Sequence, residues 1–480
     1  MYMGATFALL GLLVLSLLFA GLGWLHYSPV SMIIGLAVLL TTSLTTNWAI
    51  GYLLRIRVHQ VSAIITSLIL FFIMSPPQTT ASYVGLAAVA FFAMASKYVL
   101  AWRGRHIFNP AAAGAVIALL LTTIAPQLMA ASWWVAAPPL FIPIVLFGSF
   151  LLYRTNRLEM GYIYIATGLI VSSIVTFMQS ALTISSFTQF LTSYPILFLA
   201  YFMLSEPLTQ APRRWQRSAV AVIVAILASA QLSIGSLFVT PEIALLVGNL
   251  VAFMYAQRKL VRLRFDHSNV LANGQVAYHF TPLSKLQFDP GQYLELSIMH
   301  KKADTRGQRR MFTIASSPGA KSLRIITRHS PRSSTYKTVL HSLKKGMHIT
   351  ATGIYGDFLL PKNANEKILM IAGGIGITPF LSQLQSLKDN QESRDVTLLY
   401  FVKSKDDTIA IDELVKASEY GVKLKIVQQQ ASKKVIAGLV PDIRERVSYV
   451  SGSPMMVDAV KKSLKHLRPK RLVTDQFDGY

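Results

Sequence analysis

The stretch ILMIAGGIGITP, residues 368–379, decides the fold of the C-terminal half of this chain. It begins with an apolar run typical of a buried strand, continues through a glycine-rich turn and ends where a proline can start a helix. Small residues let a phosphate group approach the backbone, and a helix N-terminus favours its negative charge. The plainer interpretation is a tight turn without a ligand. The candidate nucleotide contacts in this turn are Gly373, Gly374, Gly376 and Thr378.

The order of strand, turn and helix recurs twice after this stretch. Repeated units of this kind predict a parallel sheet covered by helices, which we assign to residues 366–480 as an α/β nucleotide-binding domain. The expected strand and helix pairs are Ile368–Ala372 with Pro379–Leu387, Val396–Val402 with Ile411–Tyr420, and Ser448–Val450 with Pro454–Leu467.

Residues 265–361 show a different pattern, with short alternating segments such as 293–298 and 323–327 separated by Gly, Pro and Ser. Alternation with a period of two between turns predicts an antiparallel β-barrel. The soluble part of the chain is therefore expected to hold two domains, a barrel followed by a nucleotide-binding domain.

Charge divides the chain near residue 265. Of the 22 Asp and Glu residues, only Glu159, Glu206 and Glu242 precede that point. Because a bilayer makes charge costly whereas a soluble domain needs it, the two halves are expected to lie in different solvents. Residues 1–260 hold apolar stretches of spanning length at about ten positions, which predicts a polytopic α-helical membrane domain.

The basic residues of this membrane half follow the even-numbered spans only. By the positive-inside rule, both ends of the membrane domain and everything after Arg264 then face the cytoplasm. The chain is therefore expected to be a multi-pass protein of the cell membrane, in contact with membrane lipid, with its soluble module on the cytoplasmic side.

Some chemistry is excluded or disfavoured by composition. The chain has no cysteine, which excludes disulfides and Cys-ligated zinc or iron–sulfur clusters, and no metal site is expected. Haem is a poor alternative because the membrane half holds only His26, His59 and His106, all near span ends. The net charge of +24 lacks an accompanying patch of basic and aromatic residues, so no nucleic-acid partner is expected.

Two polar stretches stand out in the membrane half. Residues 102–110, WRGRHIFNP, join a basic loop to a helix start, and residues 203–209, MLSEPLT, place Glu206 at a span end. A positively charged anchor explains the first stretch, and the alternative is an anion or ring site at the helix-start N–H groups. The candidates for that membrane cofactor site are Arg103, Arg105, His106 and Asn109.

Over residues 1–257, these stretches and the span count resemble the membrane family of NqrB, from the sodium-pumping NADH:quinone reductase, and RnfD, from the Rnf complex. The resemblance implies a flavin-bearing membrane protein that passes electrons through the bilayer. The family attaches FMN to a Thr in a Gly-Ala-Thr setting beside a middle span, whereas the only such setting here is Gly4-Ala5-Thr6. Covalent FMN is therefore not expected, and a non-covalent flavin, a quinone or no membrane cofactor remain open. Ion pumping is disfavoured because no carboxylate is expected in mid-membrane.

The barrel segment RMFTIASSP, residues 310–318, places a cation, a ring and a hydroxyl on one strand. Arg310 and Phe312 are expected to share a face, with Thr313 on the other. With the glycine turn, this segment resembles the ferredoxin–NADP reductase family over nearly all of residues 265–480. The resemblance implies that Arg310 pairs with the FAD diphosphate, Phe312 packs on the flavin or its ribityl chain, and Thr313 bonds the isoalloxazine near N5.

The same resemblance implies further contacts. Residues 333–335 correspond to a second phosphate-binding segment, residues 451–456 to the nicotinamide pocket, and two aromatic residues near position 480 to a ring over the flavin. The chain departs from the family at Phe312, where Tyr is usual, and at Ser451, where Cys is frequent. The implied cofactor contacts are Ser333, Ser334, Thr335, Gly452, Met456 and Phe477, and the implied catalytic residues are Thr313, Ser451 and Tyr480.

The choice between NADH and NADPH depends on the loop after the second strand of the nucleotide domain. A 2′-phosphate would need cations there. Lys403 and Lys405 are present, but Asp406 and Asp407 follow them, so NADH is favoured.

The sequence predicts a membrane-bound NAD(P)H-dependent oxidoreductase that passes electrons through FAD into or across the membrane. FAD suits this step because it accepts two electrons together and releases them singly. The expected acceptor is a flavoprotein beyond the membrane or a quinone within it. The alternatives are a direct NAD(P)H:quinone reductase and, as a non-enzyme, a transporter or scaffold with a redox-sensing cytosolic domain.

Overall fold

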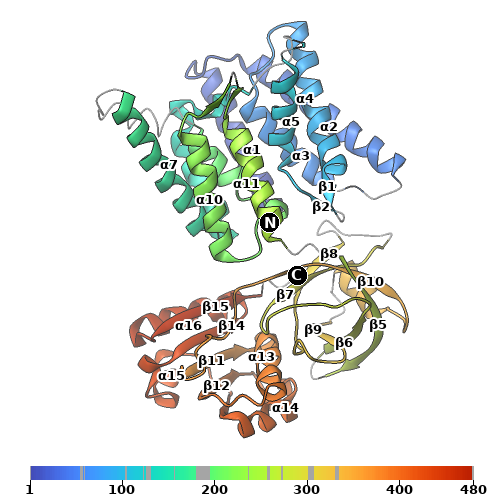
Figure 1. Ribbon diagram of the computed structural model, residues 1–480, viewed down its shortest axis with the longest axis vertical. Coiled ribbons are helices and arrows are strands. Elements are labelled where there is room, and N and C mark those ends of the chain that lie inside the picture. Colours follow the sequence, from blue (N-terminus) through green and yellow to red (C-terminus); the bar gives the residue numbers. More distant parts are fainter. Residues whose placement is uncertain are drawn as a thin grey trace. The chain divides into compact units, whose positions relative to one another are not determined.

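The computed structural model describes residues 2–54, 58, 60–102, 105–122, 124–125, 131–155, 157–179, 195–235, 237–256, 260–271, 274–300, 308–329 and 334–477. The chain forms two compact units, Met1–Ala256 and Gln257–Tyr480. The first unit is mainly helical, and the second contains both large sheets (Figure 1).

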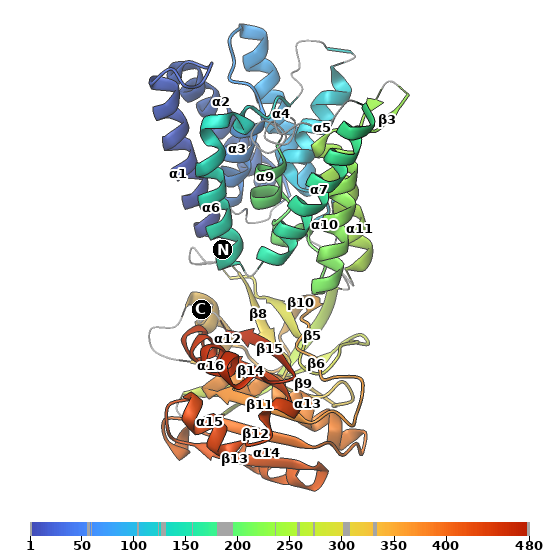
Figure 2. The ribbon, with the colours of Figure 1, turned by 90° about the vertical axis from the view of Figure 1, so that its left-hand side faces the viewer.

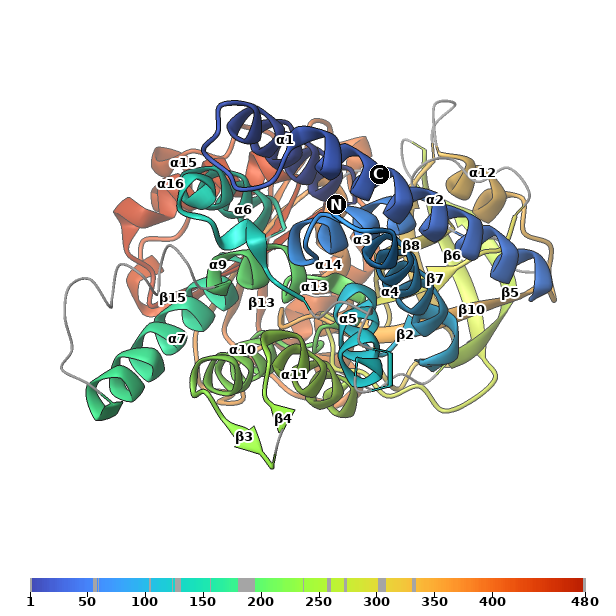
Figure 3. The ribbon, with the colours of Figure 1, turned by 90° about the horizontal axis from the view of Figure 1, so that it is seen from above.

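Long apolar helices build the first unit. Helices α2, α3 and α4 pack on one another, and α10 packs between α7 and α11 (Figure 3). The helices are α1 (Tyr2–Gly21), α2 (Pro29–Leu53), α3 (Gln60–Ile73), α4 (Thr80–Val99), α5 (Pro110–Leu121), α6 (Phe141–Arg154), α7 (Leu158–Gln179), α9 (Ile196–Phe198), α10 (Arg214–Ser229) and α11 (Pro241–Tyr255). Two short hairpins join them, β1 (Ala101–Trp102) with β2 (Arg105–His106) and β3 (Ser233–Ile234) with β4 (Leu237–Phe238).

Within the described ranges, four helices are long and apolar enough to cross a membrane, judged by length and composition: α1, α2, α4 and α7. The shorter apolar helices are α3, α5, α11 and the segment Pro138–Arg154. The number of about ten spans therefore stays a prediction, and part of the span expected at 190–204 lies outside the described residues.

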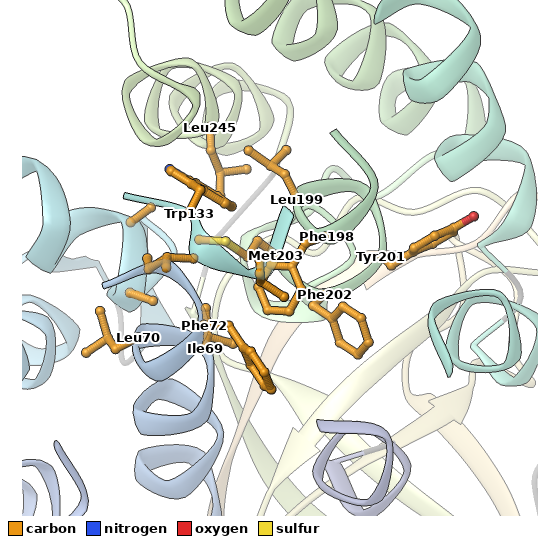
Figure 4. Close-up of a cluster of buried hydrophobic side chains, with 14 of the residues drawn as sticks. Ile69, Leu70, Phe72, Trp133, Phe198, Leu199, Tyr201, Phe202, Met203 and Leu245 are labelled. Atoms are coloured by element: carbon orange, nitrogen blue, oxygen red, sulfur yellow. The ribbon is translucent and has the colours of Figure 1, made fainter. Parts of the chain in front are cut away.

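Two expected spans are interrupted. The stretch expected to be helical from residue 132 becomes α-helical only at Phe141, after two 3-10 turns, because Pro138 and Pro139 lack the N–H groups that a helix uses. The other interruption is a π-helix at Leu199–Met203. Figure 4 shows Trp133, Phe198 and Phe202 among the apolar side chains that fill the interior beside these segments.

The larger sheet of the second unit is antiparallel, with strand order β8-β7-β10-β5-β6-β9. Its strands are β5 (Leu260–Val270), β6 (Gln275–Pro282), β7 (Tyr293–Ser297), β8 (Arg309–Thr313), β9 (Leu323–Arg328) and β10 (His348–Tyr355). An isolated bridge between Ile314 and Ile325 joins the chain just after β8 to β9. The antiparallel fold follows the predicted alternation, while closure of the sheet into a barrel stays a prediction.

The smaller sheet is parallel, with strand order β13-β12-β11-β14-β15. Helices α13 and α14 pack on one face, and α15 and α16 pack on the other (Figure 2). The elements are β11 (Ile368–Gly373), α13 (Thr378–Asp389), β12 (Val396–Phe401), α14 (Ile411–Lys416), β13 (Val422–Val427), α15 (Lys433–Leu439), β14 (Val447–Gly452), α16 (Pro454–Leu467) and β15 (Arg471–Gln476). The two edge strands β13 and β15 were missed from the sequence, because charged residues interrupt their apolar pattern.

Candidate functional site

The glycine turn lies directly against the end of a neighbouring strand. Strand β11 ends at Gly373, a 3-10 turn covers Gly374–Ile377, and α13 begins at Thr378. Gly374 has a φ of +53°, which favours glycine. A Cβ at Gly376 would lie 2.2 Å from the carbonyl oxygen of Ser451. The turn therefore needs glycine so that its backbone can reach β14.

Ser451 is the buried hydroxyl beneath this turn. The residue is 0% exposed, and among the described residues its Oγ has no hydrogen-bond partner. Leaving a buried hydroxyl unpaired costs about 1–3 kcal/mol. Native proteins rarely tolerate this cost unless a water or a ligand supplies the partner, so the site fits a bound polar group.

Met456 closes the same corner. A Cβ at Gly373 or at Gly452 would lie 2.9 Å from the Met456 sulfur, so the thioether covers both glycines. The backbone N–H of Phe477 donates to the Gly452 carbonyl oxygen at 3.0 Å. The structure thus brings Gly452 and Met456 of the expected nicotinamide pocket together with Gly373 of the turn and with Phe477, which is expected over the flavin. Tyr480 lies outside the described residues.

Asp475 belongs to this corner and was not identified from the sequence. It pairs with Ser451 in the β14–β15 ladder, and Ser451 pairs in turn with Ala372 of β11. Paired residues of neighbouring strands point to the same face of a sheet, so the carboxyl and the buried hydroxyl share a face. Although Asp475 keeps some contact with solvent, burial among protein atoms raises its pKa to about 6.

The expected FAD contacts lie on β8. Arg310 and Phe312 are buried at 6% and 8% exposure, whereas Met311 between them is 52% exposed, as alternation requires. Thr313 is also buried, at 7% exposure. The Arg310 guanidinium lies 5.1 Å from the centre of the Tyr336 ring, and the Phe312 and Tyr336 ring centres are 6.0 Å apart.

Tyr336 stands in the first turn of α12 (Thr335–His341), directly after residues 333–335, which are expected to bind a second phosphate. Ser334 caps this helix by accepting a hydrogen bond from the N–H of Lys337 at 3.4 Å. The Thr335 hydroxyl lies 3.4 Å from His300 Nε2. Ser333 lies outside the described residues, but Ser334 and Thr335 directly precede Tyr336, which contacts Arg310.

The barrel and nucleotide-binding segments are joined by hydrogen bonds from α13. Ser382 Oγ donates to the Ser316 carbonyl oxygen at 2.8 Å, and Gln383 Nε2 donates to the Phe358 carbonyl oxygen at 2.7 Å. Ser382 and Gln383 are both 0% exposed. Because α13 follows the glycine turn and Ser316 follows β8, these bonds fix the two motifs within one unit.

In the loop after β12, both carboxylates contact Ser404. Asp406 and Asp407 turn back onto the loop, where the Ser404 N–H donates to Asp407 Oδ2 at 3.2 Å and the Ser404 hydroxyl lies 3.4 Å from Asp406 Oδ2. Lys403 is exposed. The preference for NADH therefore stays a prediction.

In the first unit, the two polar stretches singled out in the sequence meet each other. His106 Nε2 lies 2.8 Å from Glu206 Oε1, and Asn109 Nδ2 donates to Glu206 Oε2 at 2.8 Å. Asn109 also caps α5 by accepting from the Ala112 N–H at 3.2 Å, and Arg105 is 6% exposed. Arg103 lies outside the described residues. Two of the groups expected to meet an anion, His106 and Asn109, thus contact a carboxylate of the chain itself.

Residues 370–462 match the profile of the oxidoreductase NAD-binding domain. The NADH oxidoreductase HCR of Escherichia coli is 27% identical over 193 residues, which cover 39% of this chain and 58% of the relative. The 2-halobenzoate 1,2-dioxygenase electron transfer component of Burkholderia cepacia is 29% identical over 216 residues, or 41% of this chain and 60% of the relative. A crystal structure of a ferredoxin NADP+ reductase from Neisseria gonorrhoeae with bound FAD and NADP is 16% identical, with a TM-score of 0.40, over 47% of this chain and all of that one.

The second unit therefore carries an oxidoreductase module of the ferredoxin reductase type, as predicted. The chain spans about half the length of the curated relatives it matches. The resemblance of the first unit to membrane proteins of the quinone reductase and Rnf complexes remains a prediction.

Proposed function

We propose that this chain is a membrane-bound NAD(P)H-dependent flavoprotein oxidoreductase. It passes electrons from cytosolic NAD(P)H through FAD into or across the membrane. Electron transfer from NAD(P)H to FAD is supported by two relatives. One is named as an NADH oxidoreductase and the other as an electron transfer component. The apolar helices of the first unit support a location in a membrane. The basic residues that follow its even-numbered spans support a second unit on the cytoplasmic side.

The observation that carries the proposal is the buried hydroxyl of Ser451 beneath the glycine turn. Its Oγ lies at the carboxyl end of a central parallel strand, where open α/β sheets bind their ligands. The nicotinamide carboxamide supplies both a donor and an acceptor that this hydroxyl can meet. The glycines at the turn leave the backbone N–H groups accessible to the pyrophosphate.

The residues around Arg310 fit FAD. Arg310 is a fixed cation beside α12, and Phe312 offers a ring next to it. FAD, when bound, accepts a hydride from nicotinamide and releases the two electrons one at a time. Thr313 at the end of β8 would hydrogen-bond the flavin, and Phe477 would cover its ring.

In this proposal, the Asp475 carboxylate stabilises positive charge on the nicotinamide ring. The nicotinamide ring becomes positively charged as the hydride leaves, and an ionised carboxylate on the same sheet face stabilises that charge. Ser451 orients the carboxamide, and Met456 excludes water from the corner. Hydride donation is then fastest when Asp475 is ionised.

The acceptor is the second part of the proposal. Transfer across the membrane to a flavoprotein on the far side agrees with the resemblance of the first unit, with a non-covalent flavin or a quinone as carrier. Direct reduction of a quinone is the second candidate, favoured by the contact between His106 and Glu206, two side chains that can carry protons. A transporter or scaffold with a redox-sensing domain would bind nucleotide without sustained turnover.

The test uses the purified full-length protein. We expect acid to release FAD and steady NAD(P)H oxidation with ferricyanide as acceptor. A colourless protein that takes up no FAD, or nucleotide binding without turnover, would contradict the proposal. Inverted vesicles with an impermeant acceptor inside separate the two acceptor candidates, because transmembrane transfer does not require added quinone.

A further inference from the structure

The carboxylate of Glu206 is held on both oxygens inside the first unit. Oε1 lies 2.8 Å from His106 Nε2, and Oε2 accepts from Asn109 Nδ2 at 2.8 Å. The side chains of His106 and Glu206 are 7% and 17% exposed. Ionisable residues inside a membrane unit are costly, so a paired one indicates a function beyond solubility.

Asn109 makes this geometry rigid. Its backbone N–H donates to Asn249 Oδ1 of α11 at 2.8 Å, and its side-chain oxygen caps α5. Its amide nitrogen is thereby directed at Glu206. The π-helix Leu199–Met203 precedes Glu206, and such π segments frequently occur at functional sites.

A His and Glu pair at hydrogen-bond distance is a proton-binding site by its chemistry. The pair can hold one proton as a neutral imidazole with a carboxylate, in either tautomer, or two as an imidazolium with a carboxylate. A second arrangement of the two protons is a neutral imidazole with a carboxylic acid. The pair can therefore release a proton and take it back without a large movement of side chains.

A polar seam lies between helices near the pair. Lys97 Nζ of α4 donates to Ser62 Oγ of α3 at 3.1 Å, and Lys97 interacts electrostatically with Glu206. The Tyr98 hydroxyl donates to Asn47 Oδ1 at 2.6 Å. Among the described residues, the charged groups near the pair are Lys97 of α4, Arg105 of β2 and Arg157. Arg157 Nη1 donates to the Ser205 carbonyl oxygen at 2.9 Å. From α5 and α11, Asn109 and Asn249 face the pair.

We propose that His106 and Glu206 form the proton-donating site for a quinone-class acceptor that is reduced in the membrane unit. The inference rests on the proposed function, which supplies the electrons. NAD(P)H, one proton and quinone yield NAD(P)+ and quinol: two electrons come from the hydride, and two O–H bonds form on the quinone. For each proton delivered, an N–H or O–H bond at the pair breaks, and the pair is reprotonated from the side of Lys97.

The experiment compares two acceptors in the full-length protein. Ferricyanide takes electrons without protons, whereas a short-chain quinone takes both. For Glu206→Gln and His106→Gln we expect an unchanged ferricyanide rate and a quinone rate lowered by about a hundredfold, the size of a general-acid contribution. The glutamine at 206 can still accept from Asn109 and donate to an unprotonated His106, so the contacts persist without the proton.

Glu159→Gln is the matched control, because Glu159 is a half-exposed carboxylate of the same unit that pairs with Arg214. It should keep both rates. Glu206→Asp, which keeps the carboxyl, should restore part of the quinone rate and its pH profile. Equal quinone rates and pH profiles in wild type and Glu206→Gln would overturn the inference.

Wild-type measurements separate the remaining outcomes and need no variant. The quinone rate should fall in D2O while the ferricyanide rate holds, because proton transfer limits only the quinone rate. Equal effects of D2O on both rates would overturn the inference. A good ferricyanide rate without quinone reduction also overturns it but leaves the proposed function standing, whereas the loss of both rates in wild type refutes the proposed function itself.

Discussion

The guanidinium carbon of Arg310 lies 5.1 Å from the centre of the Tyr336 ring. Tyr336 is 0% exposed, and its hydroxyl donates to the Leu296 carbonyl oxygen at 3.1 Å, so the ring has a fixed position. A cation over such a ring is attracted by the negative face of the π-system. Tyr336 thereby holds the cation of β8 beside the first turn of α12.

Tyr336→Leu should weaken FAD binding. Removal of the ring frees the Arg310 side chain, and a cation–π contact of about 1–2 kcal/mol corresponds to about tenfold in the FAD dissociation constant. Fluorescence titration of flavin-depleted protein measures the constant. Tyr336→Phe retains the ring and should bind FAD nearly as well as wild type, and equal affinity in the leucine variant would refute this role.

Gly376→Ala should impair the nucleotide site. The added Cβ would lie 2.2 Å from the Ser451 carbonyl oxygen, so the turn must move away from β14. Such overpacking costs about 1–3 kcal/mol, and we expect the KM for NAD(P)H to rise by about tenfold or more. Gly438→Ala serves as a control, because no atom lies within 4 Å of the added carbon. An unchanged KM would show that the nucleotide does not use this turn.

Hydride donation should depend on the ionisation of Asp475. Its pKa is raised to about 6, so the carboxylate is present above that pH and protonated below it. We expect the single-turnover rate of flavin reduction by NADH to fall as the pH drops through about 6. In Asp475→Asn the rate should be low and independent of pH in this range, and a pH profile identical to wild type would exclude the role.

Asp475 should also lower stability at neutral pH. A carboxyl whose folded pKa exceeds its ordinary value binds its proton more tightly in the folded state, so stability is greatest below the ordinary pKa and falls as the pH rises through about 6. Asp475→Asn should therefore stabilise the second unit at pH 7.5 by about 1–2 kcal/mol, reduced from the full shift because the group is partly exposed. Thermal release of flavin fluorescence measures this, and a destabilised variant would contradict it.

Two stacked histidine pairs should destabilise the second unit in acid. The rings of His267 and His279 are 4.4 Å apart, and those of His329 and His341 are 4.2 Å apart. Burial is the main cause that lowers the pKa of His279 and of His329, and the charge of the neighbouring histidine is the second cause. The unfolded chain then binds protons more readily, so stability is lost as the pH falls below the ordinary histidine value of about 6.5.

The double variant His279→Gln and His329→Gln should lose less stability than wild type as the pH falls, measured in the same thermal assay. His466→Gln is the control, because His466 is an exposed residue at the end of α16. If the double variant and wild type lose stability equally between about pH 7 and 5, the stacked pairs do not carry the effect.

Local pattern was enough to predict the glycine turn and the strand with Arg310. In both places the chemistry and the secondary structure depend on neighbours in sequence, namely an apolar run before Gly373 and the alternation from Arg310 to Phe312. The contact between His106 and Glu206 is different, since 100 positions separate the two residues. Each stretch was recognisable as unusual, but only helix packing brings them together.

Asp475 and Tyr336 could not be found in that way. Asp475 stands on an edge strand whose polar residues hide the strand pattern, and its importance comes from pairing with Ser451. Tyr336 is an ordinary aromatic residue in a short helix, and only its position under Arg310 gives it a role. Side-chain partners across strands and helices are set by tertiary packing, which one sequence does not reveal.

The hydrogen bonds from α13 to Ser316 and Phe358 have a practical consequence for protein engineering. If the nucleotide-binding half were expressed alone or grafted onto a foreign barrel, Ser382 and Gln383 would lose these hydrogen bonds and be exposed to water. A chimaera that exchanges coenzyme preference should therefore carry the barrel loops along with the helix, or restrict the swap to the exposed loop after β12.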